Sequence, residues 1–172
     1  MEPWLRGPIP DVSPLVAPVL YSFEQAREDL AEHTEGLTTE QVWARPLDLA
    51  PLGFQLRHIA GSVDRLVTYL MGKPLDETQM AALRTEMDAS ASRDELLKEV
   101  NRALDQAEAR IRSIDPASLP EPRVVGRIQL PTTVIGLLVH IAEHTQRHIG
   151  QAISAAKLAR AWGAADRSKE AH

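Results

Sequence analysis

The stretch that decides the fold class runs from Thr133 to Ile153 and reads TVIGLLVHIAEHTQRHIGQAI. Its apolar residues recur at spacings of three and four, beginning with Val134, Leu137, Leu138 and Ile141. This spacing indicates one buried face of a long α-helix, which we expect to extend from Thr132 or Thr133 to about Trp162. Three other segments show helical periodicity, and we expect long helices at about residues 14–33, 53–71 and 92–115.

Local signals mark several helix ends. Ser13 followed by Pro14 is typical of a helix start, with Ser13 as the N-cap. Ser92 and Glu95 form the S-x-x-E pattern of a capping box. We also expect short helices near residues 38–46 and 76–87. The connection at residues 115–131 is long and proline-rich, and its part at residues 123–130 is predicted to form a short irregular strand.

Composition favours helices packed on helices. The chain has 172 residues, of which 44% are hydrophobic but only 4% aromatic, so its core must consist mainly of aliphatic side chains. A β-sandwich would normally use more aromatic and β-branched residues. We therefore expect an all-α four-helix bundle with an extra short helix and long connections. One domain should span residues 1–172, with an extended arm at 1–13 and a polar tail at 163–172.

Charge, cysteine content and hydropathy exclude several classes. The net charge is −5 and Arg123 and Arg127 are isolated, so no basic stripe predicts nucleic-acid binding. The absence of cysteine excludes disulfides and thiolate ligands. The sequence shows neither a signal peptide nor an apolar run of roughly 18 residues. We expect a cytoplasmic protein that does not bind membranes.

Histidines in the deciding stretch indicate a metal site. His140, His144 and His148 follow one another at steps of four and share a helix face. All three would span about 12 Å along the axis, too far for one ion with Zn–N bonds of about 2.0–2.1 Å. Either His140/His144 or His144/His148 could therefore form the pair. Glu143 points about 100° away from His144 and is a poor ligand, suited instead to a hydrogen bond at the pocket edge.

A third ligand is needed, because catalytic zinc sites usually have three protein ligands and one open position. His58 is the best candidate. It shares a polar face of the predicted helix at residues 53–71 with Gln55, Ser62 and Arg65. Taken singly, each of these three neighbours is more often a packed or solvated polar residue than part of a pocket.

Two motifs resemble those of the DinB superfamily, also called DinB/YfiT-like. His140-Ile-Ala-Glu-His144-Thr-Gln-Arg-His148-Ile-Gly-Gln151 resembles its C-terminal motif, and the segment from Leu52 to Leu66 resembles its second-helix motif. The resemblance implies a four-helix bundle in which His58, His144 and His148 bind zinc, nickel or a similar ion, with His140 as a neighbour that supports them. Arg147 and Ile149, which flank His148, depart from the common family pattern.

The resemblance also bears on function. Some relatives transfer low-molecular-weight thiols to small electrophiles, several look like homodimers, and many have no known activity. We expect a metal-dependent enzyme acting on a small molecule, as a thiol transferase or hydrolase, with Gln55, Ser62, Arg65 and Gln151 lining its pocket. Any thiol must be an external cosubstrate, since the chain has no cysteine. Iron and manganese also accept imidazole. The alternatives are a non-catalytic metal-binding or stress-response module and a purely structural bundle.

Overall fold

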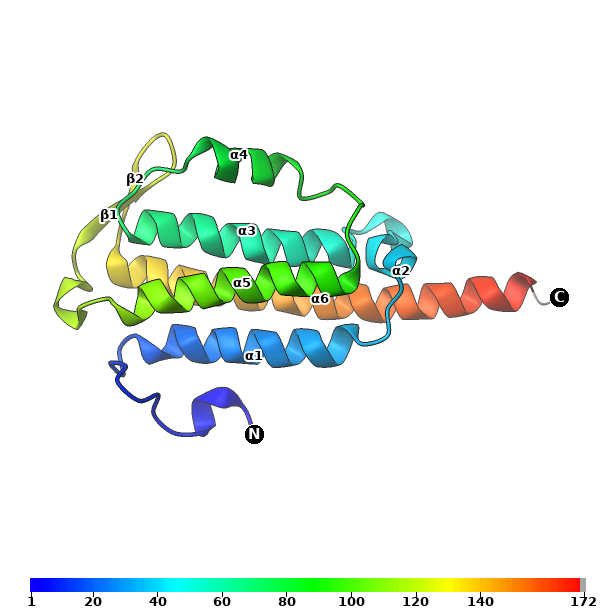
Figure 1. Ribbon diagram of the computed structural model, residues 1–172, viewed down its shortest axis with the longest axis horizontal. Coiled ribbons are helices and arrows are strands. Elements are labelled where there is room, and N and C mark those ends of the chain that lie inside the picture. Colours follow the sequence, from blue (N-terminus) through cyan, green and yellow to red (C-terminus); the bar gives the residue numbers. More distant parts are fainter. Residues whose placement is uncertain (171–172) are drawn as a thin grey trace.

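The computed structural model describes the backbone of residues 1–170 and the side chains of residues 1–163. Four long helices lie side by side in an elongated bundle (Figure 1). They are α1 (Ala17–Thr34), α3 (Leu52–Leu70), α5 (Arg93–Arg112) and α6 (Val134–Glu170). Helix α3 packs against both α5 and α6, and α1 packs against the other sides of the same two helices. The predicted all-α bundle is therefore confirmed.

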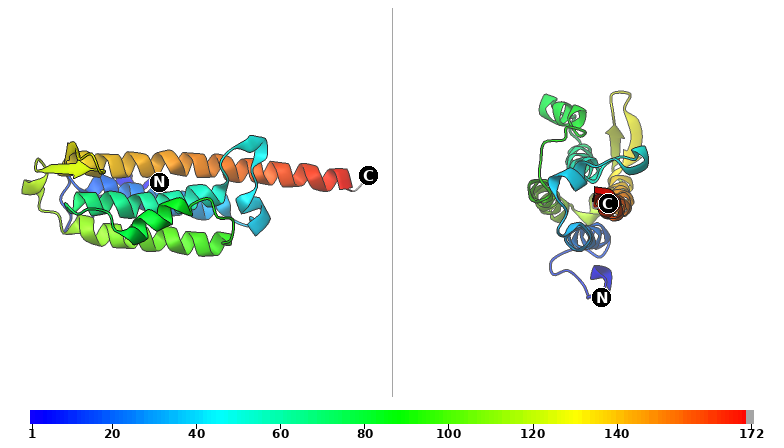
Figure 2. Two further views of the ribbon diagram at one scale, coloured as in Figure 1. Left: turned by 90° about the horizontal axis from the view of Figure 1, so that it is seen from above. Right: turned by 90° about the vertical axis from the view of Figure 1, so that its right-hand side faces the viewer.

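The chain direction requires one long crossover. Helices α1 and α6 run one way in Figure 1, whereas α3 and α5 both run the other way. The chain therefore returns along the outside of α3, through α4 (Glu77–Arg84), before α5 begins (Figures 1 and 2). Gln79 fastens this crossover, because its amide donates to Asp64 Oδ2 at 2.7 Å and to Thr68 Oγ1 at 2.8 Å on α3.

The remaining elements are short. They are η1 (Pro3–Leu5), α2 (Thr39–Trp43), η2 (Pro46–Asp48), η3 (Pro116–Ser118), β1 (Pro122–Val125) and β2 (Leu130–Thr133). Where one irregular strand was predicted, β1 and β2 pair as an antiparallel hairpin, with Val125 opposite Leu130. Gly126, with φ of 74°, begins the turn between them. Strand β1 also contacts α3, so the hairpin lies near the point where the crossover leaves α3.

Helix ends agree with the predictions only in part. The capping box of Ser92 and Glu95 is confirmed at the start of α5. The predicted start of α1 at Pro14 was wrong, because the helix begins at Ala17 with Val16 as its N-cap. Ser13 accepts from Leu15 N–H through Oγ at 3.3 Å in the turn before the helix. If the helix began at Pro14, Pro18 would lie where the helix needs a backbone N–H donor, which proline lacks. With the observed start, Pro18 is the second helical residue, whose N–H has no partner within the helix in any case. Helix α6 continues to Glu170 instead of ending near Trp162.

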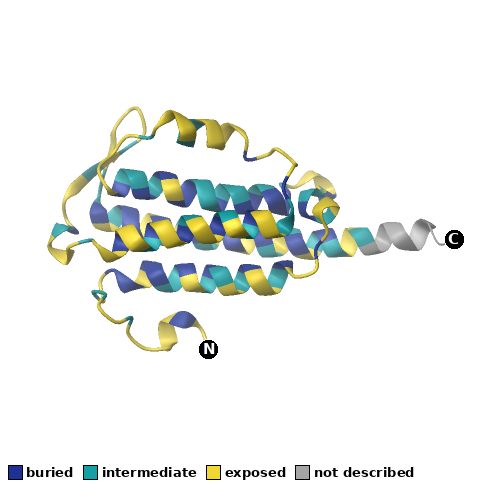
Figure 3. Ribbon diagram, viewed as in Figure 1, coloured by how far each residue is buried: buried dark blue, intermediate teal, exposed yellow. Residues whose placement is uncertain are grey.

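The core lies between the four long helices and is mainly aliphatic. Figure 3 shows buried positions along the inward sides of α1, α3, α5 and α6. Leu30, Leu56, Leu104 and Ile141 are at most 1% exposed. None of the helices that the structure describes is both long and apolar enough to cross a membrane.

Close packing at the start of α3 makes a stability prediction possible. A Cβ atom on Gly53 would approach the Trp43 ring to 2.7 Å. Trp43 cannot easily move, because its Nε1–H donates to the carbonyl oxygen of Ala91 at 2.7 Å. We expect Gly53→Ala to lower the free energy of unfolding by about 1–3 kcal/mol, as overpacking does.

A matched control is Gly150→Ala on α6, where a Cβ would meet nothing within 4 Å. There the better helix propensity of alanine should raise the free energy of unfolding, by up to about 1 kcal/mol. Urea unfolding of both variants measures the difference. Equal effects of the two substitutions would show that the contact with Trp43 does not constrain the start of α3.

Candidate metal site

Three histidines from two facing helices converge on one point. His58 lies on α3, and His144 and His148 lie one turn apart on α6. One ring nitrogen from each of the three lies within 4.8 Å of the others. The ring centroids of His58 and His148 are 4.3 Å apart, and those of His144 and His148 are 4.6 Å apart. The cluster is compatible with a divalent metal ion.

His58 is oriented by a buried carboxylate. Its Nδ1 donates to Glu86 Oε2 at 2.8 Å, because an ionised carboxylate can only accept. In the neutral ring the other nitrogen, Nε2, then carries the lone pair, and it lies 3.2 Å from His144 Nε2. The ring of Phe54 stacks on His58 with a centroid distance of 5.5 Å. These contacts hold the Nε2 of His58 toward the other two histidines.

His148 is oriented in the same way by Gln55. The Nδ1 of His148 donates to Gln55 Oε1 at 2.8 Å, and Gln55 is 5% exposed. This hydrogen bond leaves Nε2 as the free nitrogen of His148. Metal-binding histidines almost always donate their second nitrogen in this manner, which sets the tautomer and strengthens the ligand.

The donor set fits an imidazole-binding cation. His144 Nδ1 is buried and has no hydrogen-bond partner. His144 therefore contributes to the polar contacts of the cluster only through Nε2. Two lone pairs, on His58 and His148, are already directed inward, and neutral imidazole nitrogens suit zinc, nickel, iron and related ions. A cation bound at the converging nitrogens would replace the 3.2 Å contact between His58 Nε2 and His144 Nε2.

The same environment favours the neutral form of His144 and His148. Burial, reinforced by the nearby His58, lowers the pKa of His144 and lowers that of His148 to about 4. A metal ligand must be unprotonated, so protons compete weakly with an ion at these two rings at neutral pH.

Glu86 is the site residue that sequence reasoning missed. It lies on the crossover after α4, is 6% exposed, and also accepts from Arg65 Nη2 at 3.0 Å. Burial alone would raise the pKa of Glu86, but the hydrogen bond from His58 and the charge of Arg65 outweigh burial and lower it. Gly61 leaves room for this pair, since a Cβ there would lie 2.7 Å from Arg65 Nη1. No local pattern separates Glu86 from the other 23 acidic residues.

The other predicted residues lie around the cluster at different depths. Arg65 acts through Glu86, and Ser62 is buried, with its hydroxyl donating to the Ile59 carbonyl at 3.2 Å. Gln151 is exposed, and its proximity to His148 offsets a small part of the lowered pKa. The sequence alone had left open whether His140 or His148 joins His144, and His148 is the one that faces His58.

A second, more exposed cluster contains His140, Glu143 and His144. His140 Nδ1 lies 2.8 Å from Glu143 Oε1, and both side chains are more than 40% exposed. Glu143 also pairs with Arg147, so its charge is already compensated. This cluster is a weaker cation site, because two of its three members are solvated and Glu143 already has two protein partners.

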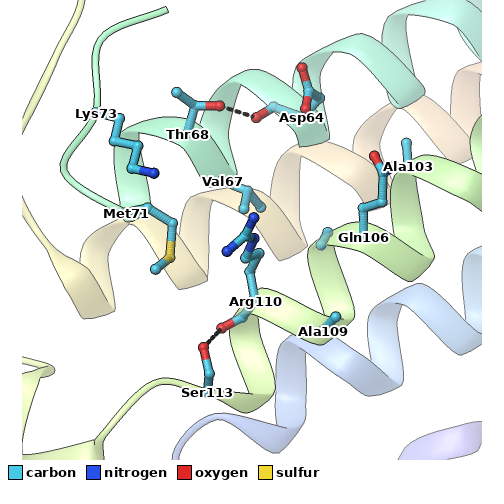
Figure 4. A pocket seen from close by; sticks show the side chains of 11 residues that line it. Asp64, Val67, Thr68, Met71, Lys73, Ala103, Gln106, Ala109, Arg110 and Ser113 are labelled. Carbon is cyan, nitrogen blue, oxygen red and sulfur yellow. Dashed lines mark hydrogen bonds between the residues drawn. The ribbon is translucent and has the colours of Figure 1, made fainter.

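A cleft of about 390 Å³ opens beside His58 and His144, between α3, α6, α4 and the hairpin turn. A larger groove, of about 690 Å³, lies between α3 and α5 (Figure 4). Its lining includes Asp64, Lys73 and Arg110 but no histidine. The smaller cleft is therefore the one that gives a molecule access to the histidine cluster.

Comparisons with known proteins agree with this architecture. A sequence model described as the DinB superfamily matches residues 22–152, which include all three clustered histidines and Glu86. The fold is similar to the crystal structure of a Streptococcus pneumoniae protein, with a TM-score of 0.56 and 16% identity over 87% of this chain and 88% of that one. None of the curated proteins matches this chain.

Proposed function

Since the chain belongs to the DinB superfamily, we propose that it is a metal-dependent enzyme acting on a small molecule, as a thiol transferase or a hydrolase. In this proposal His58, His144 and His148 hold one divalent ion, with zinc or nickel first and iron or manganese next. The observation that carries it is the convergence of three imidazoles, two of which are turned inward by hydrogen bonds at 2.8 Å to Glu86 and Gln55. Histidines that only pack would also hydrogen-bond a buried Nδ1, so the support for a metal ion is the convergence of one ring nitrogen from each of the three within 4.8 Å.

In this proposal the chain's own residues would bind the metal ion, orient the three ligand rings and cover one of them. Three neutral imidazoles leave a bound divalent ion with its full charge and an open position, where it lowers the pKa of a bound water or thiol. Gln55 and Glu86 hold the ligand rings, and Phe54 covers one face of His58. The cleft beside His58 and His144 admits the substrate. A thiol nucleophile would come from a cosubstrate, because the chain contains no cysteine.

Metal removal tests the first half of the proposal. A ligand that binds only the native state stabilises it by about 4 kcal/mol when present at roughly a thousand times its Kd. For a chain of this size, chelation should then lower the melting temperature by roughly 10 °C. Thermal unfolding before and after dialysis against a chelator, followed by restoration with zinc or nickel, measures this. An unchanged melting temperature would indicate a purely structural bundle.

An activity assay tests the second part of the proposal, that the bound metal ion is catalytic. The metal-loaded protein is assayed with small electrophiles and low-molecular-weight thiols, and with esters and amides in the absence of thiol. Turnover that requires both metal and thiol identifies a transferase, and turnover that requires metal alone identifies a hydrolase. Stable metal binding with no turnover in either series would favour a non-catalytic metal-binding module.

A further inference from the structure

The cleft beside the histidine cluster has an apolar wall built from three separate parts of the chain. Leu66 on α3, Leu75 before α4, and Met80 and Leu83 on α4 all line it. Leu83 is 40% exposed, and the other three are partly exposed. The hydrophobic core lies between the four long helices, whereas these four side chains form an apolar wall of an open cleft, next to the histidine cluster. Ligand sites typically combine such a wall with a few polar groups.

Two polar side chains that line the same cleft have no hydrogen-bond partner through any of their atoms, among the residues whose side chains are described. The Tyr69 hydroxyl and the Arg127 guanidinium make no hydrogen bond or ion pair with any residue whose side chain the structure describes. Arg127 follows Gly126 in the hairpin turn, which places it at the cleft rim. Asp76 and Glu77 line an adjoining hollow with Arg127, yet neither comes within ion-pair distance of it. The positive charge at the rim is therefore available to a ligand.

We propose that this cleft takes a small organic anion with an apolar body. The body lies against Leu66, Met80 and Leu83, the anionic end meets Arg127 and Tyr69, and the opposite end reaches the open position beside His58 and His144. The inference rests on the proposed function, because it uses the metal ion as one of three contacts. It adds the class of substrate, which the histidine cluster alone does not indicate.

Cobalt-loaded protein provides a direct test, since binding of a thiolate to cobalt is visible in its absorption spectrum without any turnover. The probes are a ladder of omega-mercaptoalkanoates, from mercaptopropionate to mercaptooctanoate, each compared with the mercaptoalkanol of equal length. The thiol serves as the metal-binding end and the alkyl chain as the body, and the paired probes differ only in the charge of the far end. We expect one chain length to bind about tenfold more tightly as the carboxylate than as the alcohol, as a hydrogen bond to a charged group predicts.

Arg127→Gln should abolish this preference and leave the affinity for the mercaptoalkanol unchanged, and Tyr69→Phe should reduce the preference in part. The matched control is Arg84→Gln, because Arg84 is an exposed arginine on α4 that lines the adjoining hollow and not the cleft. It should keep the full preference. Arg127 is exposed, and its side chain makes no hydrogen bond or ion pair with the described residues. Arg127→Gln should therefore melt at the wild-type temperature.

The outcomes separate this inference from the proposed function. If cobalt and thiols bind but no chain length favours the carboxylate, or if Arg127→Gln keeps the preference, the anion site is wrong while the metal site stands. If cobalt binds and no thiol does, the three-point ligand is also wrong. If cobalt itself fails to bind, both the proposed function and this inference are wrong.

Discussion

Alanine at His58, His144 or His148 is expected to weaken zinc binding by more than about 100-fold. Loss of a residue that only supports a ligand typically costs about 10–100-fold in metal affinity, and loss of the ligand itself must cost more. Each of the three rings also offers one potential ligand atom within 4.8 Å of the other two. We therefore expect three losses of similar size, measured by competition with a chromogenic chelator and by metal content after gel filtration.

His140→Ala is the matched control, because His140 lies on the same helix, one turn before His144, but outside the three-histidine cluster. Its zinc affinity should equal that of the wild type. The opposite pattern, with loss in His140→Ala and full binding in His148→Ala, would place the ion at the exposed cluster with Glu143. The melting temperatures of the metal-free variants show whether a loss of zinc binding reflects unfolding. Substitution of a metal ligand should lower the melting temperature of the metal-bound protein more than that of the metal-free protein.

The bundle could be predicted from the sequence because its signals are local. Periodic apolar residues define α3, α5 and α6, and Ser92 with Glu95 marks the start of α5. The errors arose where two local signals compete. Ser13 and Pro14 are favourable at a helix start, but Pro18 decides the boundary because it tolerates only the first turn. The hairpin was underpredicted, since its strands have four residues each and pair only with one another.

Helix periodicity alone left the site ambiguous, and within the sequence only the resemblance to the DinB superfamily selected His58, His144 and His148. The spacing of His144 and His148 places both on one face, but it gives His140 the same relation to His144. What separates His148 from His140 is the position of His58 on another helix, which is a tertiary fact. Glu86 belongs to the same category, because its contact with His58 spans 28 residues and depends on the path of the crossover around α3.

Glu86→Gln is expected to lower zinc affinity by about 10–100-fold, although Glu86 contacts the other nitrogen of His58 and is not one of the three clustered residues. The carboxylate accepts the Nδ1 proton of His58 at 2.8 Å and so directs Nε2 inward. Glutamine preserves the shape and can still accept one hydrogen bond, but it lacks the negative charge that strengthens the imidazole as a donor to a cation. Either substitution leaves the buried Arg65 without a counterion, at a stability cost of about 3–5 kcal/mol, but glutamine is preferable to alanine because Glu86→Ala would also remove both hydrogen-bond acceptors of His58 and Arg65.

The control for this prediction is Glu143→Gln. Glu143 also contacts a histidine Nδ1 at 2.8 Å, in this case that of His140, but it lies at the exposed cluster. If the ion binds at His58, His144 and His148, only Glu86→Gln should weaken binding and shift the absorption spectrum of bound cobalt. Equal zinc affinity in Glu86→Gln and the wild type would mean that Glu86 serves only to neutralise Arg65. A loss confined to Glu143→Gln would instead place the ion at the exposed cluster on α6, of which His140 and His144 line the same cleft.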